Sequence, residues 1–175
     1  MASYTVRVLN SSGSAKSYVL FMPPPQLGPA GGDVTVYTNA WVTFSSILPN
    51  GIDTITYNDT TFAYWATTTL PVRPGATMGQ SGFAAVSLIQ QDSVPFIGLA
   101  PAGFGQVTAG GATVGAYRIV AASDFNASNG YVFGFALPGN IPGLPSPVAT
   151  FLAEPNDSFN IQPTTTRCHV IDGSY

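Results

Sequence analysis

Apolar and polar residues alternate with a period of two along most of this chain, which is the pattern of β-strands with one buried face. In the first such stretch, Tyr4, Val6 and Val8 fall on one face. Residues 17–22 are apolar throughout, as in a strand buried on both faces. The proline-rich residues 23–32 end that strand, since proline cannot donate a hydrogen bond to a neighbouring strand.

The rest of the chain continues this pattern. Residues 34–47 are long enough for two strands, or for one bent strand that passes between sheets. We interpret residues 53–58 and 60–69 as a hairpin, because they flank a short Asp-Thr turn. Only residues 82–92 show any helical spacing, and their glycine and β-branched residues oppose a helix. Further strands are expected over 83–90, 94–100, 105–109, 112–122, 131–137, 149–153, 158–162 and 166–171.

Turn signals recur about every 8–12 residues, which is the spacing of sandwiches, jelly rolls and barrels. The pattern predicts a single all-β domain over residues 1–175. We expect an antiparallel β-sandwich or jelly roll of about ten or more short strands, or a closed barrel. The Pro/Gly segments between the strands are long and apolar. Such loops usually pack on a sheet end, a pocket mouth or a second subunit.

Charged residues make up only 7% of the chain, against a usual ~25%. With a formal net charge of −3 and a single lysine, Lys16, the chain cannot build a basic patch, so we expect no nucleic-acid partner. It has no run of ~18 or more apolar residues, so we expect no membrane span. A surface with so few charges is prone to association, and we expect a homo-oligomer.

One cysteine excludes an internal disulfide and is consistent with a reducing compartment. The N-terminal residues alternate like a strand and lack the pattern of a signal peptide, so we expect a cytoplasmic protein. Four Asn-x-Ser/Thr sequons keep open the alternative of a secreted protein whose signal peptide is absent from this sequence. They begin at Asn10, Asn58, Asn126 and Asn156.

Metal and cofactor chemistry is poorly supported. A zinc site needs three or four ligands, and the chain has one histidine and one cysteine, so we expect no metal site and no cofactor. Asp124, Asn126 and Ser128 alternate as in the opening of a calcium loop, but the required glycine and glutamate positions do not match. A turn explains the same residues. The eight acidic residues show no paired spacing, which leaves a two-carboxylate glycosidase untested.

Cys168 and His169 are adjacent near the C-terminus. Neighbouring strand residues point to opposite faces, so the two cannot serve one site. We expect Cys168 to pack inward and His169 to lie near Arg167 at the surface or at a pocket rim. If the protein is an enzyme, His169 is the candidate general base.

Aromatic residues on polar strand faces are the strongest functional signal. Alternation through 34–47 places Tyr37, Asn39 and Trp41 on one face, and alternation through 60–69 places Trp65 among alanine and threonines. An exposed ring covers the apolar face of a sugar, and amide and hydroxyl groups satisfy the sugar hydroxyls. A covering sheet or subunit, or a bulge between residues 37 and 41, would remove this exposed face.

These observations predict a non-enzymatic, lectin-like binding module for a glycan or a small apolar ligand. The composition is similar to that of small β-sandwich lectins, a likeness that includes no motif and assigns no residue. The first alternative is a metal- and cofactor-independent small-molecule enzyme, such as an isomerase, cyclase or hydrolase, with an apolar pocket. The second alternative is a self-assembling structural protein.

Overall fold

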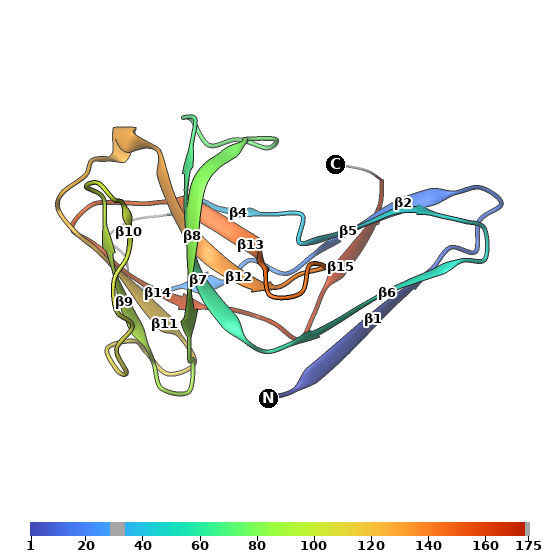
Figure 1. The fold of residues 1–175 in the computed structure, drawn as a ribbon, viewed down its shortest axis with the longest axis horizontal. Coiled ribbons are helices and arrows are strands. Elements are labelled where there is room, and N and C mark those ends of the chain that lie inside the picture. Colours follow the sequence, from blue (N-terminus) through green and yellow to red (C-terminus); the bar gives the residue numbers. More distant parts are fainter. Residues whose placement is uncertain (29–33, 174–175) are drawn as a thin grey trace.

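The computed structural model describes residues 1–28 and 34–173. The predicted breaker 23–32 therefore lies only partly within the described residues. These ranges contain fifteen strands and one short 3-10 helix, η1 (Ala127–Asn129), which confirms the all-β prediction. The strands form four sheets with open edges, so the described part of the chain is a sandwich rather than a closed barrel. Figure 1 shows two parts, a thicker head and an elongated arm.

The head is a sandwich of two five-stranded sheets, which we call sheet I and sheet II. Sheet I has the order β10 (Gly103–Phe104), β9 (Ser93–Ile97), β11 (Tyr117–Ala121), β14 (Ser158–Gln162), β3 (Gln26–Leu27). Sheet II has the order β4 (Val36–Thr38), β13 (Pro145–Leu152), β12 (Tyr131–Pro138), β7 (Thr61–Thr68), β8 (Met78–Val86). All the pairs are antiparallel except β9 with β11.

The arm is a smaller sandwich that continues from the head. One layer pairs β1 (Ser3–Leu9) with β6 (Ile52–Asn58). The other has the order β15 (His169–Asp172), β2 (Lys16–Phe21), β5 (Val42–Ile47). The N-terminal and C-terminal strands thus both lie in the arm, whereas the middle of the chain builds the head (Figure 1).

One contiguous cluster of buried apolar side chains runs from the head into the arm. In the head, Phe133 of sheet II meets Phe96 and Phe159 of sheet I at ring-centroid distances of 4.9 and 5.9 Å. In the arm, Val42 and Ile55 belong to the same cluster. Burial of this continuous apolar surface is the main driving force for packing both sandwiches, with each Phe side chain contributing about 1.5–3 kcal/mol.

Strand pairing at the boundary between arm and head overturns one sequence expectation and decides another. The predicted hairpin of residues 53–58 and 60–69 is wrong, because β6 pairs with β1 while β7 pairs with β12 and β8. The short Asp-Thr segment carries the chain from the arm into the head. Residues 34–47 form two strands, β4 and β5, in different sheets. This is the first of the two expected arrangements, two strands rather than one bent strand. Residues 78–86 form β8 and no helix.

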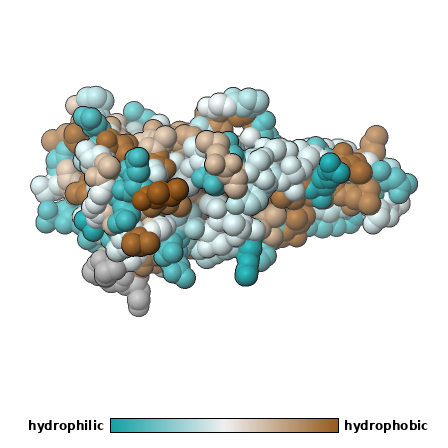
Figure 2. Space-filling view, turned by 90° about the horizontal axis from the view of Figure 1, so that it is seen from below, coloured by the Kyte–Doolittle hydropathy of each residue, from teal (hydrophilic) through white to brown (hydrophobic). Residues whose placement is uncertain are grey.

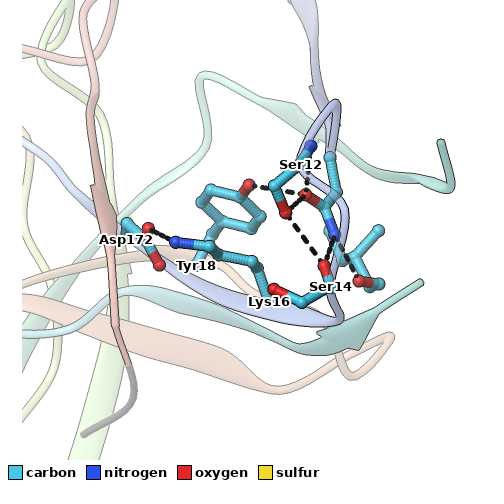
Figure 3. A network of polar contacts seen from close by, with 7 residues as sticks. Ser12, Ser14, Lys16, Tyr18 and Asp172 are labelled. Carbon is cyan, nitrogen blue, oxygen red and sulfur yellow. Dashed lines mark hydrogen bonds and ion pairs between the residues drawn. The ribbon is translucent and has the colours of Figure 1, made fainter. Parts of the chain in front are cut away.

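A buried asparagine organises the far end of the arm. The Asn10 amide nitrogen donates to the carbonyl oxygens of Ser14 and Ile47 at 2.8 and 2.7 Å. Its amide oxygen accepts from the backbone and hydroxyl of Ser12 and from the Tyr18 hydroxyl. Figure 3 shows this network beside the ion pair of Lys16 and Asp172. Because the amide of Asn10 is fully buried and already used, this sequon cannot accept a glycan in the folded chain.

Candidate functional site

The candidate site is a cavity of about 610 Å³ on the outer face of sheet II. Its floor comes from β4, β13 and β7, and one wall comes from the loop between β7 and β8. That loop packs on an apolar cluster around Tyr64, Ala66 and Val132, on the face opposite the main core. The lining residues are Phe21, Val36, Tyr37, Thr38, Asn39, Ala40, Tyr64, Val72, Arg73, Pro74, Gly75, Ala76, Met78, Pro147 and Thr150.

Strand register explains why these residues meet. Tyr37 pairs with Thr150, Thr150 with Gly134, Gly134 with Tyr64, and Tyr64 with Phe83. Paired residues share one face of a sheet, so this row crosses the whole of sheet II on its outer side. Gly134 sits in the middle, and a Cβ there would collide with the carbonyl oxygen of Ala149. The middle of the row therefore carries no side chain, and tyrosine and threonine side chains stand on either side of it.

Tyr64 is the most informative residue of the cavity. Its ring stacks on Phe83 at a centroid distance of 5.2 Å, and the residue is only 1% exposed. Its hydroxyl has no hydrogen-bond partner among the described residues. Burial raises the pKa of this hydroxyl to about 12, so the group is a neutral donor and acceptor at physiological pH. The hydroxyl oxygen is not among the buried polar atoms that lack a partner, so it reaches the cavity surface, where water or a ligand can bond to it.

Asn39 and Thr150 add polar groups on the same side. The Thr150 hydroxyl donates to the Asn39 amide oxygen at 3.3 Å, and the Asn39 backbone N–H donates to Val148 at 2.8 Å. The Asn39 amide nitrogen makes no hydrogen bond within residues 1–28 and 34–173. The backbone thus holds Asn39 in place while its amide donors stay available.

The wall opposite β4 is a tight turn from Arg73 to Ala76. The Ala76 N–H donates to the Arg73 carbonyl at 3.0 Å, and Gly75 has a φ of 79°. Pro74 precedes this glycine, so the turn follows the Pro-Gly pattern of type II, in which the third residue needs a positive φ. Arg73 is exposed, and its guanidinium makes no ion pair in the described part of the chain. It is the charged residue of the cavity lining.

Of the four residues predicted to bind ligand, two line the cavity and two lie in the core. Tyr37 and Asn39 are half-buried and line the cavity. The expected exposure of Trp41 and Trp65 is wrong, since they are 3% and 4% exposed and belong to the main core. The described cavities therefore bring together only two of the four predicted ligand-binding residues.

The two tryptophans are buried for different reasons. Trp41 lies between β4 and β5, where the chain changes sheets, so the alternation that holds at Tyr37 no longer applies. Its ring meets Tyr57 at a centroid distance of 4.8 Å, and its buried indole N–H has no hydrogen-bond partner among the described residues. Trp65 pairs with Phe133 on the inner face of sheet II and packs 5.4 Å from Phe96, between the two sheets of the head.

His169 and Cys168 fall in different environments. His169 is exposed and lines a second cavity of about 430 Å³ with Phe21, Met22, Pro23, Pro24, Thr38 and Ile171. Its side chain makes no hydrogen bond or ion pair with the described residues, so no acid or nucleophile is hydrogen-bonded to it there. Cys168 is half-buried against the main core, and burial raises the pKa of its thiol.

The calcium-like turn uses its polar groups internally. The Asp124 carboxylate accepts from the backbone N–H groups of Gly98 and Leu99 at 2.9 and 3.1 Å. Asn126 caps η1 by accepting from the Ser128 N–H at 3.0 Å. These contacts satisfy the oxygens that would otherwise be free to face an ion. Within the described ranges, no three His, Cys, Asp or Glu side chains are grouped as metal ligands would be.

The chain matches no protein-family model, no curated protein and no solved structure. None of the helices in the described residues is long and apolar enough to cross a membrane. The residues of the cavity are therefore the basis for any functional conclusion. Three of them, Tyr64, Arg73 and Thr150, carry no signal in the sequence, since strand pairing and the β7–β8 turn bring them together.

Proposed function

We propose that this protein is a non-enzymatic, lectin-like carbohydrate-binding module whose site is the outer-face cavity of sheet II. The observation that carries the proposal is the hydroxyl of Tyr64, which has no partner among the described residues and reaches the cavity that Asn39 and Thr150 also line. A bound hydroxylated ligand would satisfy it.

The lining has the mixture that a sugar requires. Val36, Met78, Pro147 and the tyrosine rings offer apolar surface to the C–H face of a pyranose. The tyrosine and threonine hydroxyls, the Asn39 amide and the Arg73 guanidinium offer hydrogen bonds to its hydroxyl groups. A volume of about 610 Å³ is within the range of small-molecule sites, ~300–1,000 Å³. A few fixed polar groups on a mostly apolar surface are the usual basis of ligand specificity.

Calorimetry on glycans selected from an array tests this proposal. Tyr64→Phe removes one hydroxyl and keeps the ring, so we expect the wild-type affinity to fall by about tenfold, the equivalent of ~1.4 kcal/mol. Tyr37→Ala should weaken binding further because it removes a wall of the cavity. Tyr131→Phe is the matched control, since the Tyr131 hydroxyl bonds Gly98 outside the cavity.

The outcome is decisive in both directions. Loss of affinity in the two cavity variants with an unchanged Tyr131→Phe supports the proposal. Absence of any bound glycan across the array, or equal affinity for wild type and both cavity variants, would overturn it. Circular dichroism of each variant separates loss of binding from loss of folding.

Self-assembly is a second candidate function, and the far end of the arm favours it. Leu9 and Ile52 are paired at the ends of β1 and β6, and the neighbouring Leu48 lies in the turn before β6. All three are more than half exposed. Figure 2 shows apolar surface at this end of the molecule. Contiguous exposed apolar side chains at a protruding end are typical of contact surfaces between subunits.

Sedimentation velocity over a range of concentrations tests self-assembly. We expect a homo-oligomer for the wild type and a monomer for the double variant Leu48→Ser with Ile52→Ser. The control Ile89→Ser, at an even more exposed position of the head, should leave the oligomer intact. A wild-type monomer at every concentration would exclude this candidate function.

A further inference from the structure

We infer that the ligand is an extended oligosaccharide rather than a single terminal sugar, and that it occupies the outer-face cavity of sheet II and the cavity beside His169 at once. This inference rests on the proposed function. The cavity of about 610 Å³, here the first compartment, and the cavity of about 430 Å³, the second compartment, share two lining residues, Phe21 and Thr38. They therefore adjoin as two parts of one cleft.

Strand pairing places the junction between the compartments. Phe21 ends β2 and pairs with His169, the first residue of β15. Thr38 ends β4 and pairs with Ala149 on β13. The first residue belongs to the arm and the second to the head, so the cleft crosses the boundary between the two parts. Phe21 and Thr38 are each held by sheet hydrogen bonds, which keep the positions of the two compartments fixed relative to each other.

The second compartment repeats the chemistry of the first. Phe21, Pro23, Pro24 and Ile171 supply apolar surface, and His169 and Thr38 supply polar groups. Neither the imidazole of His169 nor the hydroxyl of Thr38 is hydrogen-bonded within the described residues. Two adjoining sites with the same combination of apolar surface and available hydrogen-bonding groups fit a ligand made of repeated units. An oligosaccharide has that property.

The size and exposure of the cleft agree with a chain-like ligand. Each compartment alone is within the ~300–1,000 Å³ range of sites for a small molecule. A monosaccharide in the first would leave the second empty. Exposed residues line both compartments, Arg73 and Pro74 the first and His169 and Ile171 the second. A chain can therefore lie in the cleft with both of its ends in solvent.

Calorimetry with ligands of increasing length tests the inference. The probes are the cello-, chito-, xylo- and malto-oligosaccharide series, each from the monosaccharide to the hexasaccharide. In the series that binds, the affinity should rise by about tenfold or more between the monosaccharide and the length that fills both compartments, and then level off. Covalent linkage makes binding in the second compartment intramolecular, which is the source of this gain.

Variants of the second compartment test whether this compartment causes the rise in affinity with ligand length. Ile171→Ser and His169→Ala should remove most of the increase with length and leave the affinity for the monosaccharide unchanged. Val170→Ser is the matched control, because Val170 is similarly exposed on the same strand and does not line the cleft. A length-independent affinity, or equal losses for short and long ligands in Ile171→Ser, would overturn the inference while leaving the proposed function intact. Absence of binding to every series and every array glycan would overturn both.

Discussion

The hydroxyl of Tyr117, on β11, donates a hydrogen bond of 2.8 Å to the carbonyl oxygen of Gly134, on β12. Both residues are fully buried, and they belong to opposite sheets of the head. The bond therefore crosses the apolar core and joins sheet I to the strand at the centre of the candidate site's floor. Gly134 lies one residue from a register shift of β12 against β13. This hydrogen bond therefore helps to hold sheet II in place against sheet I beneath the cavity.

Tyr117→Phe should lower the free energy of unfolding by about 1–3 kcal/mol, because the ring still fills the core while the Gly134 carbonyl loses a partner. Chemical denaturation followed by fluorescence measures the change. Tyr131→Phe is the control, since its hydroxyl bonds the Gly98 carbonyl in a partly buried position and should cost less. Equal stability of Tyr117→Phe and wild type would show that this bond does not hold the sheets together.

The strands of this protein are largely predictable from the sequence, because alternation and turn residues are local properties of the chain. Residues 3–9 and 17–22 correspond to β1 and β2, within one residue at each end. The hairpin at the Asp-Thr turn was wrong because pairing is not local. The same short connection serves a hairpin or a passage from the arm into the head, and only burial of distant side chains distinguishes them.

The site was only half predictable, and Tyr64 and Trp65 show why. They are adjacent on β7, so they point to opposite faces, and alternation with alanine and threonines predicts Trp65 on the exposed face. In the structure both are buried, since β7 is a central strand covered by the core on one side and by the β7–β8 loop on the other. Alternation separates two faces but does not say what covers each one.

Asn10→Ala should destabilise the end of the arm. The substitution removes two amide donations, a buried one to the carbonyl oxygen of Ile47 and a part-buried one to that of Ser14. We expect a loss of about 2–4 kcal/mol from two such groups at ~1–3 kcal/mol each, with partial access of water reducing the sum. Hydrogen exchange should show faster exchange at the backbone N–H of Asn50, which bonds the Asn10 carbonyl.

The exposed Asn126→Ala is the control for the arm variant, because it removes a cap on η1 in the head. It should cost less than Asn10→Ala, in the range of about 0.5–2 kcal/mol usual for a cap. It should also leave exchange in the arm unchanged. Unaltered exchange at Asn50 in Asn10→Ala would contradict the role assigned to the network in Figure 3.

Alkaline pH should destabilise the folded chain through its buried tyrosines. Burial raises the pKa of Tyr64 from 10.0 to about 12, and it also raises the pKa of Tyr117. Above pH 10 the unfolded state therefore loses protons that the folded state keeps. Stability is fully present below pH 10 and declines as the pH rises through the folded pKa. Denaturation midpoints between pH 8 and pH 11, measured with tyrosinate absorbance, test this direction.

Tyr64→Phe provides the check on the alkaline effect. The variant should show a shallower decline of stability with pH than the wild type, since one raised pKa is removed while the ring remains. Repeating the series at higher salt screens general charge repulsion and should preserve the difference. Identical slopes for the variant and the wild type would mean that Tyr64 titrates normally in the fold.

Cys168 should react slowly with a thiol reagent in the folded protein. The thiolate is the reactive form, and burial against the core raises the thiol pKa, so little thiolate is present at neutral pH. We expect the native chain to react several-fold more slowly than the chain in denaturant, measured with a chromogenic disulfide at one pH. Because the chain has no other cysteine, one rate reports one site. Equal native and denatured rates would place the thiol in open solvent, and Cys168→Ser, which should give no signal, verifies the assignment.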